Sequence, residues 1–320
     1  MPTELKFLKW TGGSIGQSGL YEGMPLERYH SAGCCDGISV SSSVLRRIFN
    51  QSPAHYWATS VYNPKRVEED EEISRGMVLG RAMHHLMLGE PAFAALFRKA
   101  PDEVPDRNGT LVPWSLRTKY AKEWCDARRR EGRIVIFPSE VAQLQGMAFA
   151  LGAHPVIKSG AFDGYVERSG FWRDKETGIW LKVRPDVIPS ASGDFVDLKT
   201  TISVQWSDLQ RTIIDYGYVM QFALMRTVFR ALGYPVASAT LIFVERKPPH
   251  CVRVVSLSPQ DLDAGEKANR VALRTFTRCY TSGVWPGPGG VRRDAEEIFL
   301  PDWHHDQIKA RMAAYGEEEG

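Results

Sequence analysis

The chain has 320 residues, of which 43% are apolar and 24% are charged, and its formal net charge is +2. These values fit one large globular domain with a sizeable core. They exclude a strongly basic nucleic-acid coat protein, but they leave room for a local basic groove. No apolar run approaches the ~20 residues of a membrane span, and the N-terminus lacks a secretory pattern. We therefore expect a cytoplasmic protein with no membrane partner.

The cysteines are too scattered to indicate a metal site or a disulfide framework. Cys34 and Cys35 are adjacent, while Cys125, Cys251 and Cys279 stand apart and form no CxxC pair. This spacing supports neither a structural zinc nor an iron–sulfur cluster. We expect reduced thiols, as in most cytosolic proteins.

The first 37 residues are rich in Gly, Ser and Tyr and show no clear periodicity, so we expect an irregular N-terminal arm. From residue 38 the pattern becomes helical, with N-cap serines at 41–43 and a break at Ser52-Pro53. Gly76, Gly80 and His84 then recur every four residues and share one helix face. Two glycines permit close approach of another element, so His84 points into a tight contact. Taken alone, such a histidine is more often a packing residue than a ligand.

Helices are also expected at "PAFAALFRKA", within residues 101–137 and at "SEVAQLQGMAFALGAHP". Residues 164–201 change to the alternation of three consecutive strands, joined by the turns "KETG" and "PSASG". A helix near 204–212, another at "YGYVMQFALMRTVFRALG", a strand at "ASATLIFVERK" and a long helix near 259–282 follow. We predict one α/β domain over 38–303, with a central mixed β-sheet flanked by helices. A charged C-terminal tail, 304–320, completes the chain.

Two aspartates and a lysine interrupt the apolar strands of "LKVRPDVIPSASGDFVDLKTT". Because strand side chains alternate, Asp197 and Lys199 share one face of the third strand. Asp186 ends the preceding strand, and a short connection lets it converge on Asp197. Two converging carboxylates repel, and a divalent cation such as Mg²⁺ resolves that conflict. Lys199 would then orient or deprotonate an attacking water, or stabilise charge on a phosphorus atom.

A simpler interpretation must be weighed beside this one. An Asp–Lys pair on an exposed strand is usually a weak surface salt bridge. Gln221 lies on the apolar stripe of its helix, so its amide needs either a polar site or a structural partner. A strand glutamate such as Glu167 commonly faces solvent. The apolar neighbours of the two aspartates, and the glycine-lined helix that bears His84, favour the catalytic interpretation.

The motif "RPDVI…DFVDLKTT" resembles that of the PD-(D/E)XK nucleases. Four further segments resemble the exonuclease VIII (RecE-type) branch of phage recombination exonucleases, and the likeness covers roughly residues 38–303. They are "ISVSSSVLRRIFNQSPAHYW", "LGRAMHHLMLGEPAF", "YGYVMQFALM" and "IFLPDW". One position departs from the family, which often has an aromatic residue where this chain has Met225.

The resemblance implies a role for each matching residue. His84, Asp186 and Asp197 would bind the metal, with the carbonyl of Leu198 as a further ligand. Lys199 would be the catalytic lysine. Gln221 would support the site from the helix after the strand, and Glu167 would match an acidic residue on the first strand. Mg²⁺ is the expected ion, with Mn²⁺ as a substitute.

The resemblance also implies an exonuclease that resects double-stranded DNA ends 5′ to 3′ and leaves 3′ single strands for recombination. A RecT-like single-strand annealing protein would be its partner, and a ring-like homo-oligomer, a trimer or tetramer, its assembly. Two alternatives stay open. One is an endonuclease or repair nuclease of the same fold, of the Cas4 or RecB kind. The other is a protein that binds DNA ends without cutting them. A nucleotide-driven motor is disfavoured because the chain lacks a phosphate-binding loop motif.

Overall fold

The computed structural model describes residues 4–67, 74–89, 93–189, 194–236, 238–290 and 295–316. The chain divides into two compact units, residues 1–285 and 286–320. The first unit therefore ends short of residue 303, which the sequence indicated as the domain end. In the second unit, the described residues include helix α12 (Asp302–Ala314). Within the described ranges, no helix is long and apolar enough to cross a membrane.

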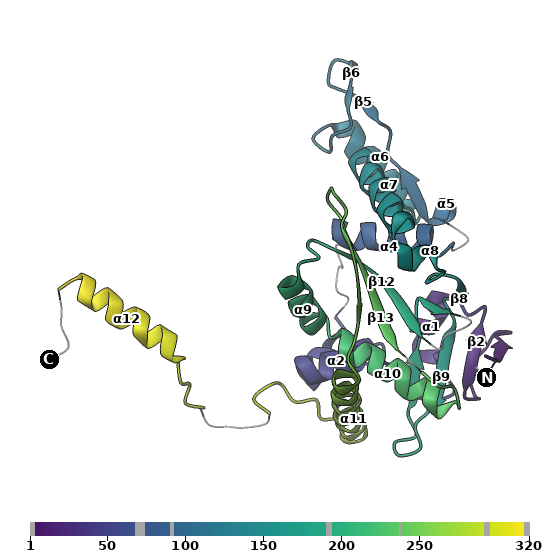
Figure 1. Ribbon diagram of the computed structural model, residues 1–320, viewed down its shortest axis with the longest axis vertical. Helices are drawn as coiled ribbons and strands as arrows, with labels where there is room; N and C mark the ends of the chain where they lie inside the picture. The colour runs from purple at the N-terminus through teal and green to yellow at the C-terminus, as the bar shows by residue number, and fades with distance from the viewer. Residues whose placement is uncertain are drawn as a thin grey trace. The chain divides into compact units, whose positions relative to one another are not determined.

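The sheet at the centre of Figure 1, called here the central sheet, is mixed. Its middle strand, β12, runs parallel to β13 on one side and antiparallel to β11 on the other. The order of its strands is β14 (Val252–Ser256), β13 (Ala239–Glu245), β12 (Phe195–Thr201), β11 (Val187–Pro189) and β8 (Gly164–Val166). The turn "PSASG" expected between β11 and β12 lies mainly at residues 190–193, outside the described part.

Alternation along β12 separates two cores, as its sequence predicts. Phe195 packs into the core on the side of helices α2 (Ser42–Asn50), α10 (Tyr218–Ala231) and α11 (Pro259–Ser282). Val196 and Leu198 pack into the core beneath α4 (Arg75–Met87) and α7 (Pro138–Ala153). Figure 1 shows these two groups of helices on opposite sides of β12 and β13. The expected layered α/β arrangement is therefore present.

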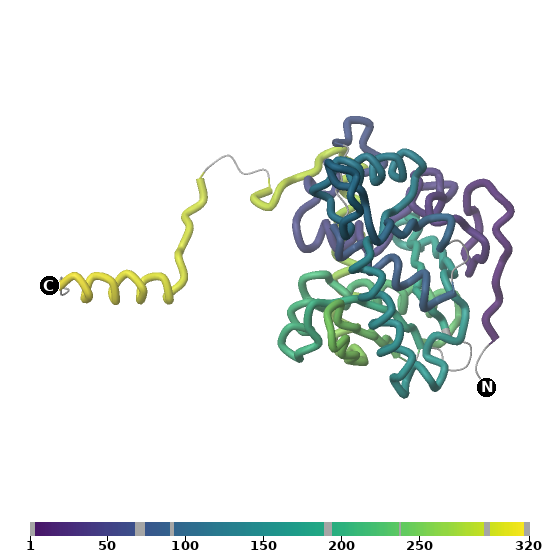
Figure 2. Tube along the Cα trace, turned by 90° about the horizontal axis from the view of Figure 1, so that it is seen from above, coloured from purple at the N-terminus to yellow at the C-terminus, as the bar shows by residue number. Residues whose placement is uncertain are grey.

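A second five-stranded sheet incorporates the N-terminal segment, which runs along one edge of this unit in purple (Figures 1 and 2). Its order is β1 (Phe7–Lys9), β2 (Gly19–Glu22), β9 (Ser169–Arg173), β10 (Trp180–Val183) and β3 (Ser39–Ser41). The arm expected to be irregular over 1–37 therefore contains short regular elements among its described residues, which also form α1 (Leu26–His30). Leu20 is fully buried, but strands of three or four residues are too short to reveal a period.

The predicted hairpin of two long strands is broken where it passes from one sheet to the other. Glu167, with a φ of 55°, separates β8 in the central sheet from β9 in the second sheet. On the returning chain, residues 184–186 separate β10 from β11. Asp186 therefore lies at the point where the chain enters the central sheet, directly before β11.

Other elements mostly follow the sequence. The segment "PAFAALFRKA" differs, since its described part is a single helical turn followed by a strand that pairs with β7. The remaining elements are η1 (Ala32–Cys34), α3 (Pro53–Thr59), α5 (Phe93–Leu96), β4 (Phe97–Lys99), β5 (Glu103–Pro105), β6 (Leu111–Pro113), α6 (Lys119–Arg130), β7 (Ile134–Ile136), α8 (Pro155–Lys158) and α9 (Trp206–Asp215).

Candidate active site

Strand β12 brings a carboxylate and an ammonium together at the middle of the central sheet. Asp197 is only 2% exposed, and its side chain contacts Nζ of Lys199, two residues further along the same face. The same Nζ lies 4.0 Å from Oδ2 of Asp186. The two aspartates that the sequence predicted to converge therefore meet around one lysine.

Asp186 is tied to β12 by a backbone hydrogen bond. The amide of Leu198 donates to Oδ2 of Asp186 over 3.0 Å. The neighbouring register pairs Val187 with Val196 in the antiparallel ladder of β11 and β12. Because Asp186 precedes β11 directly, this ladder fixes its position relative to Asp197.

Helix α4 presents His84 to the same centre through its glycine face. A Cβ on Gly80 would lie 3.3 Å from Oγ1 of Thr200, so this face approaches β12 closely, as predicted. Nε2 of His84 lies 2.5 Å from the carbonyl oxygen of Leu198, which assigns it as the N–H donor. Nδ1 of His84 lies 3.4 Å from Oδ2 of Asp186.

Burial and mutual charge set the protonation of this cluster. Burial raises the pKa of Asp186 well above its usual range, and the charge of Asp197 raises it further. Burial would lower the pKa of Lys199, but the charges of Asp197 and Asp186 outweigh it and raise that pKa. Burial, together with Lys199, lowers the pKa of His84 to about 4, so the imidazole is neutral. A neutral imidazole is the form that ligates metals.

The chemistry of these groups fits a hard divalent cation. Oδ1 of Asp197 is buried and accepts no hydrogen bond within the described residues, which is costly for a carboxylate. Oxygen donors of this kind are what Mg²⁺ prefers. In the described ranges, no three His, Cys, Asp or Glu side chains already surround a common ion position. His84, Asp186, Asp197 and the Leu198 carbonyl thus remain the predicted ligands.

Gln221 and Glu167 line a cavity that adjoins Asp186. The cavity has a volume of about 260 Å³ and also reaches Arg46. Gln221 is half-buried and follows the left-handed Gly217 at the start of α10. Glu167 lies between strands rather than on one, and its carboxylate pairs with Arg184. Gln221 therefore shares a cavity with Asp186 of the candidate site, whereas the carboxylate of Glu167 is already in an ion pair.

A larger groove of about 610 Å³, called here the Lys199 groove, opens on the side of His84 and Lys199. Nζ of Lys199 lies 5.4 Å from the ring centre of Tyr218, and the Tyr218 ring stacks on Tyr216. Arg211 and Arg246 also line the groove, although the sequence did not single them out. Arg246 directly follows the buried strand β13, so the sequence could have placed it at the end of a strand of the sheet.

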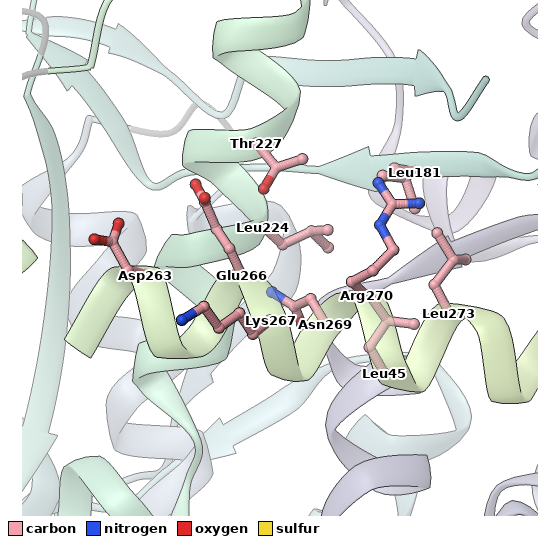
Figure 3. Close-up of a pocket in the computed structure, with 10 residues that line it drawn as sticks. All are labelled: Leu45, Leu181, Leu224, Thr227, Asp263, Glu266, Lys267, Asn269, Arg270 and Leu273. Atoms are coloured by element: carbon pink, nitrogen blue, oxygen red, sulfur yellow. The ribbon is translucent and has the colours of Figure 1, made fainter. Parts of the chain in front are cut away.

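A separate cavity of about 440 Å³ lies between α10, α11 and β10, and it contains none of the predicted site residues (Figure 3). Three of its charged groups are already paired, while Lys267 also lines it. Asp263 and Glu266 accept hydrogen bonds from Arg226, and Arg270 donates to Asp174. The candidate active site is therefore the cluster around Lys199, not this cavity.

A mixed sheet between two helical layers, with two aspartates and a lysine at its centre, defines a nuclease of the PD-(D/E)XK class. The sequence matches a family model over residues 41–292, and that family is described as a PDDEXK-like domain of unknown function (DUF3799). The chain belongs to this family. The predicted fold class is therefore confirmed.

A solved structure shows a similar fold. A "Putative exonuclease" from Eubacterium rectale is 12% identical with a TM-score of 0.58, and the match covers 88% of this chain and 98% of that one. At this identity the likeness shows the fold alone.

A weaker match is a phage related exonuclease from Haemophilus somnus, with 14% identity and a TM-score of 0.28, covering 63% of this chain and 95% of that one. Its score is too low to carry an argument. No curated protein matches the sequence.

Proposed function

We propose that the chain is a Mg²⁺-dependent exodeoxyribonuclease that degrades linear double-stranded DNA from its ends. The observation that carries this proposal is the meeting of Asp186, Asp197 and Lys199 at the middle of the central sheet. A retired site would have no reason to keep two buried carboxylates facing each other. The presence of this cluster within the PD-(D/E)XK fold supports phosphodiester hydrolysis.

The reaction is the attack of water on phosphorus, in which a new P–O bond forms as the bond to the leaving oxygen breaks. Asp186, Asp197, His84 and the Leu198 carbonyl would hold the cation, which supplies water activation and charge stabilisation when bound. Lys199 orients the water or stabilises the charge that develops on the phosphoryl oxygens. We expect Mn²⁺ to replace Mg²⁺, because both accept oxygen ligands.

The finer features rest on the resemblance to exonuclease VIII. They are 5′ to 3′ polarity, 3′ single-stranded products for recombination, a RecT-like annealing partner and a ring-like homo-oligomer. We also propose a cytoplasmic location, since the five cysteines, all in the described part of the chain, form no disulfide.

Digestion of end-labelled linear duplex beside a covalently closed circle tests the proposal. Each substrate is incubated with Mg²⁺ or chelator, using the wild type and Lys199→Ala. Loss of the linear DNA alone, dependent on metal and Lys199, is the expected result. Cutting of the circle would instead indicate an endonuclease or repair nuclease of this fold. No metal-dependent cutting of either substrate would indicate a protein that binds DNA ends without cleaving them.

A further inference from the structure

Arg246 is held at the mouth of the Lys199 groove by the end of the central sheet. Strand β13 runs parallel to β12, with Glu245 opposite Thr201. The ladder extends one step, because the amide of Arg246 donates to the Thr201 carbonyl over 3.0 Å. The β13–β14 turn is fixed from behind, where Nδ1 of His250 lies 3.0 Å from the Glu245 carbonyl. Its backbone therefore places Arg246 beside the end of the strand that carries Lys199.

The side chain of Arg246 lies on the glycine face of α4. A Cβ on Gly76 would collide with Nη1 of Arg246, so this guanidinium position requires glycine there. Gly76, Gly80 and Lys199 line the same groove. Gly80 faces the strand, whereas Gly76 makes room for the arginine. Gly80 therefore permits the close approach of Thr200, and Gly76 permits that of Arg246.

Within the described residues, the guanidinium of Arg246 forms no ion pair, unlike those of Arg184 and Arg226, which are both paired. Burying part of a cation without a partner is unfavourable unless a ligand supplies the opposite charge. Arg246 is half-buried and lines the groove with Arg211 and the acidic Asp208. The groove thus offers two arginines to an anionic ligand, whereas the ammonium of Lys199 is already engaged by Asp197.

Aromatic surface in the same groove narrows the chemistry of that ligand. Tyr216 is 63% exposed, and its ring stacks on Tyr218 with an interplanar angle of 14°. Exposed tyrosine rings beside cations are the means by which proteins hold single-stranded nucleic acid, through stacked bases and neutralised phosphates. A simple anion would make no use of the rings.

We propose that Arg246 is a substrate-positioning residue, whose guanidinium holds a backbone phosphate of the DNA strand that the Lys199 groove leads to the catalytic centre. This inference rests on the proposed function. Arg246 does not touch the reacting atoms, so its loss weakens binding of the strand rather than the chemical step. Its bidentate fork suits a phosphate better than a lysine would.

The test compares Arg246→Gln with Lys247→Gln, which removes the same charge from the next residue, an exposed one outside the groove. Binding of a fluorescein-labelled linear duplex is measured by anisotropy over a salt series, with Ca²⁺ in place of Mg²⁺, and KM and kcat for cleavage are measured with Mg²⁺. For Arg246→Gln we expect KM to rise about tenfold with little change in kcat. The salt slope should fall by about one phosphate contact. Lys247→Gln should match the wild type.

Gly76→Ala provides a second, independent variant. The added methyl displaces only the mobile end of Arg246, and alanine favours the helix, so folding should not suffer. Gly76→Ala alone should raise KM as Arg246→Gln does, and the double variant should be no worse than Arg246→Gln. Equal KM and salt slope for Arg246→Gln and Lys247→Gln would overturn the inference. Failure of the wild type to cut any DNA would overturn the proposed function. The salt dependence of DNA binding would still show whether Arg246 contacts a phosphate.

Discussion

His84 of α4 hydrogen-bonds to the backbone of Leu198 on β12, with Nε2 2.5 Å from the carbonyl oxygen. This contact joins a helix and a strand that are more than a hundred residues apart in the chain. It also joins two of the four predicted metal ligands to each other. The same histidine can therefore act as a structural hydrogen-bond donor or as a metal ligand, and the two roles make different predictions.

We expect His84→Ala to weaken metal dependence more than folding. The loss of one hydrogen bond should cost about 1 kcal/mol of the free energy of unfolding. The loss of a ligand should raise the Mg²⁺ concentration for half-maximal cleavage by about tenfold or more. A Mg²⁺ titration of the cleavage rate and a urea unfolding curve measure the two effects. His85→Ala, on the next position of α4, is the control. A large loss of stability with an unchanged Mg²⁺ requirement would show that His84 is a packing residue.

Asp197→Ala should abolish cleavage while it leaves DNA binding largely intact. Asp197 is a buried predicted metal ligand that does not line the Lys199 groove, whereas Arg211 and Arg246, which would meet DNA, do line it. Cleavage of end-labelled duplex and its binding by gel shift measure the two properties. Asp194→Asn, an acidic residue just before the same strand, should cut normally. Cleavage by Asp197→Ala at the wild-type rate would refute the site assignment.

Lys199→Met should destabilise the protein in chelator and recover when a divalent cation is added. The ammonium contacts Asp197 and lies 4.0 Å from Asp186, so its removal leaves two buried carboxylates without a cation. Breaking such a buried pair costs about 3 kcal/mol. Ca²⁺ supplies the missing charge through oxygen ligands. Urea unfolding with and without Ca²⁺ should therefore show a larger stabilisation for the variant than for the wild type, and equal stabilisation would contradict a cation site between the carboxylates.

The meeting of the candidate site residues could be predicted from the sequence because these residues lie on strong, local patterns. Asp197 and Lys199 stand two residues apart on an apolar strand, and alternation alone puts them on one face. His84 follows Gly76 and Gly80 at helical spacing. Each of these relationships depends only on the repeat of a single strand or helix, which can be read from the sequence.

Arg246 and the N-terminal sheet could not be predicted in the same way, because both depend on pairing between distant segments. The strand that ends at Glu245 was visible, but its parallel register with β12 was not, and only that register places Arg246 near Lys199. Leu20 is buried because β2 pairs with β9, about 150 residues later. The passage of the chain from one sheet to the other at Glu167 likewise cannot be predicted without knowing both sheets.

The low pKa of His84 predicts how stability depends on pH. The folded protein holds His84 neutral down to about pH 4, whereas an unfolded histidine binds a proton near pH 6.5. Between these values the unfolded chain carries the extra proton, so falling pH favours unfolding and the contribution present above pH 6.5 is lost.

In chelator, we therefore expect the free energy of unfolding to fall less steeply between pH 6.5 and pH 4 in His84→Gln than in the wild type. Glutamine keeps a hydrogen-bond donor for the Leu198 carbonyl but does not titrate, so the difference between the two slopes isolates the imidazole. Urea unfolding at a series of pH values measures both slopes. His55→Gln, on α3 and far from the cluster in sequence, is the matched control and should keep the wild-type slope. If His84→Gln also showed the wild-type slope, the pKa of His84 would not differ between the folded and unfolded chain. The argument that His84 is a neutral imidazole able to bind a metal would then fail.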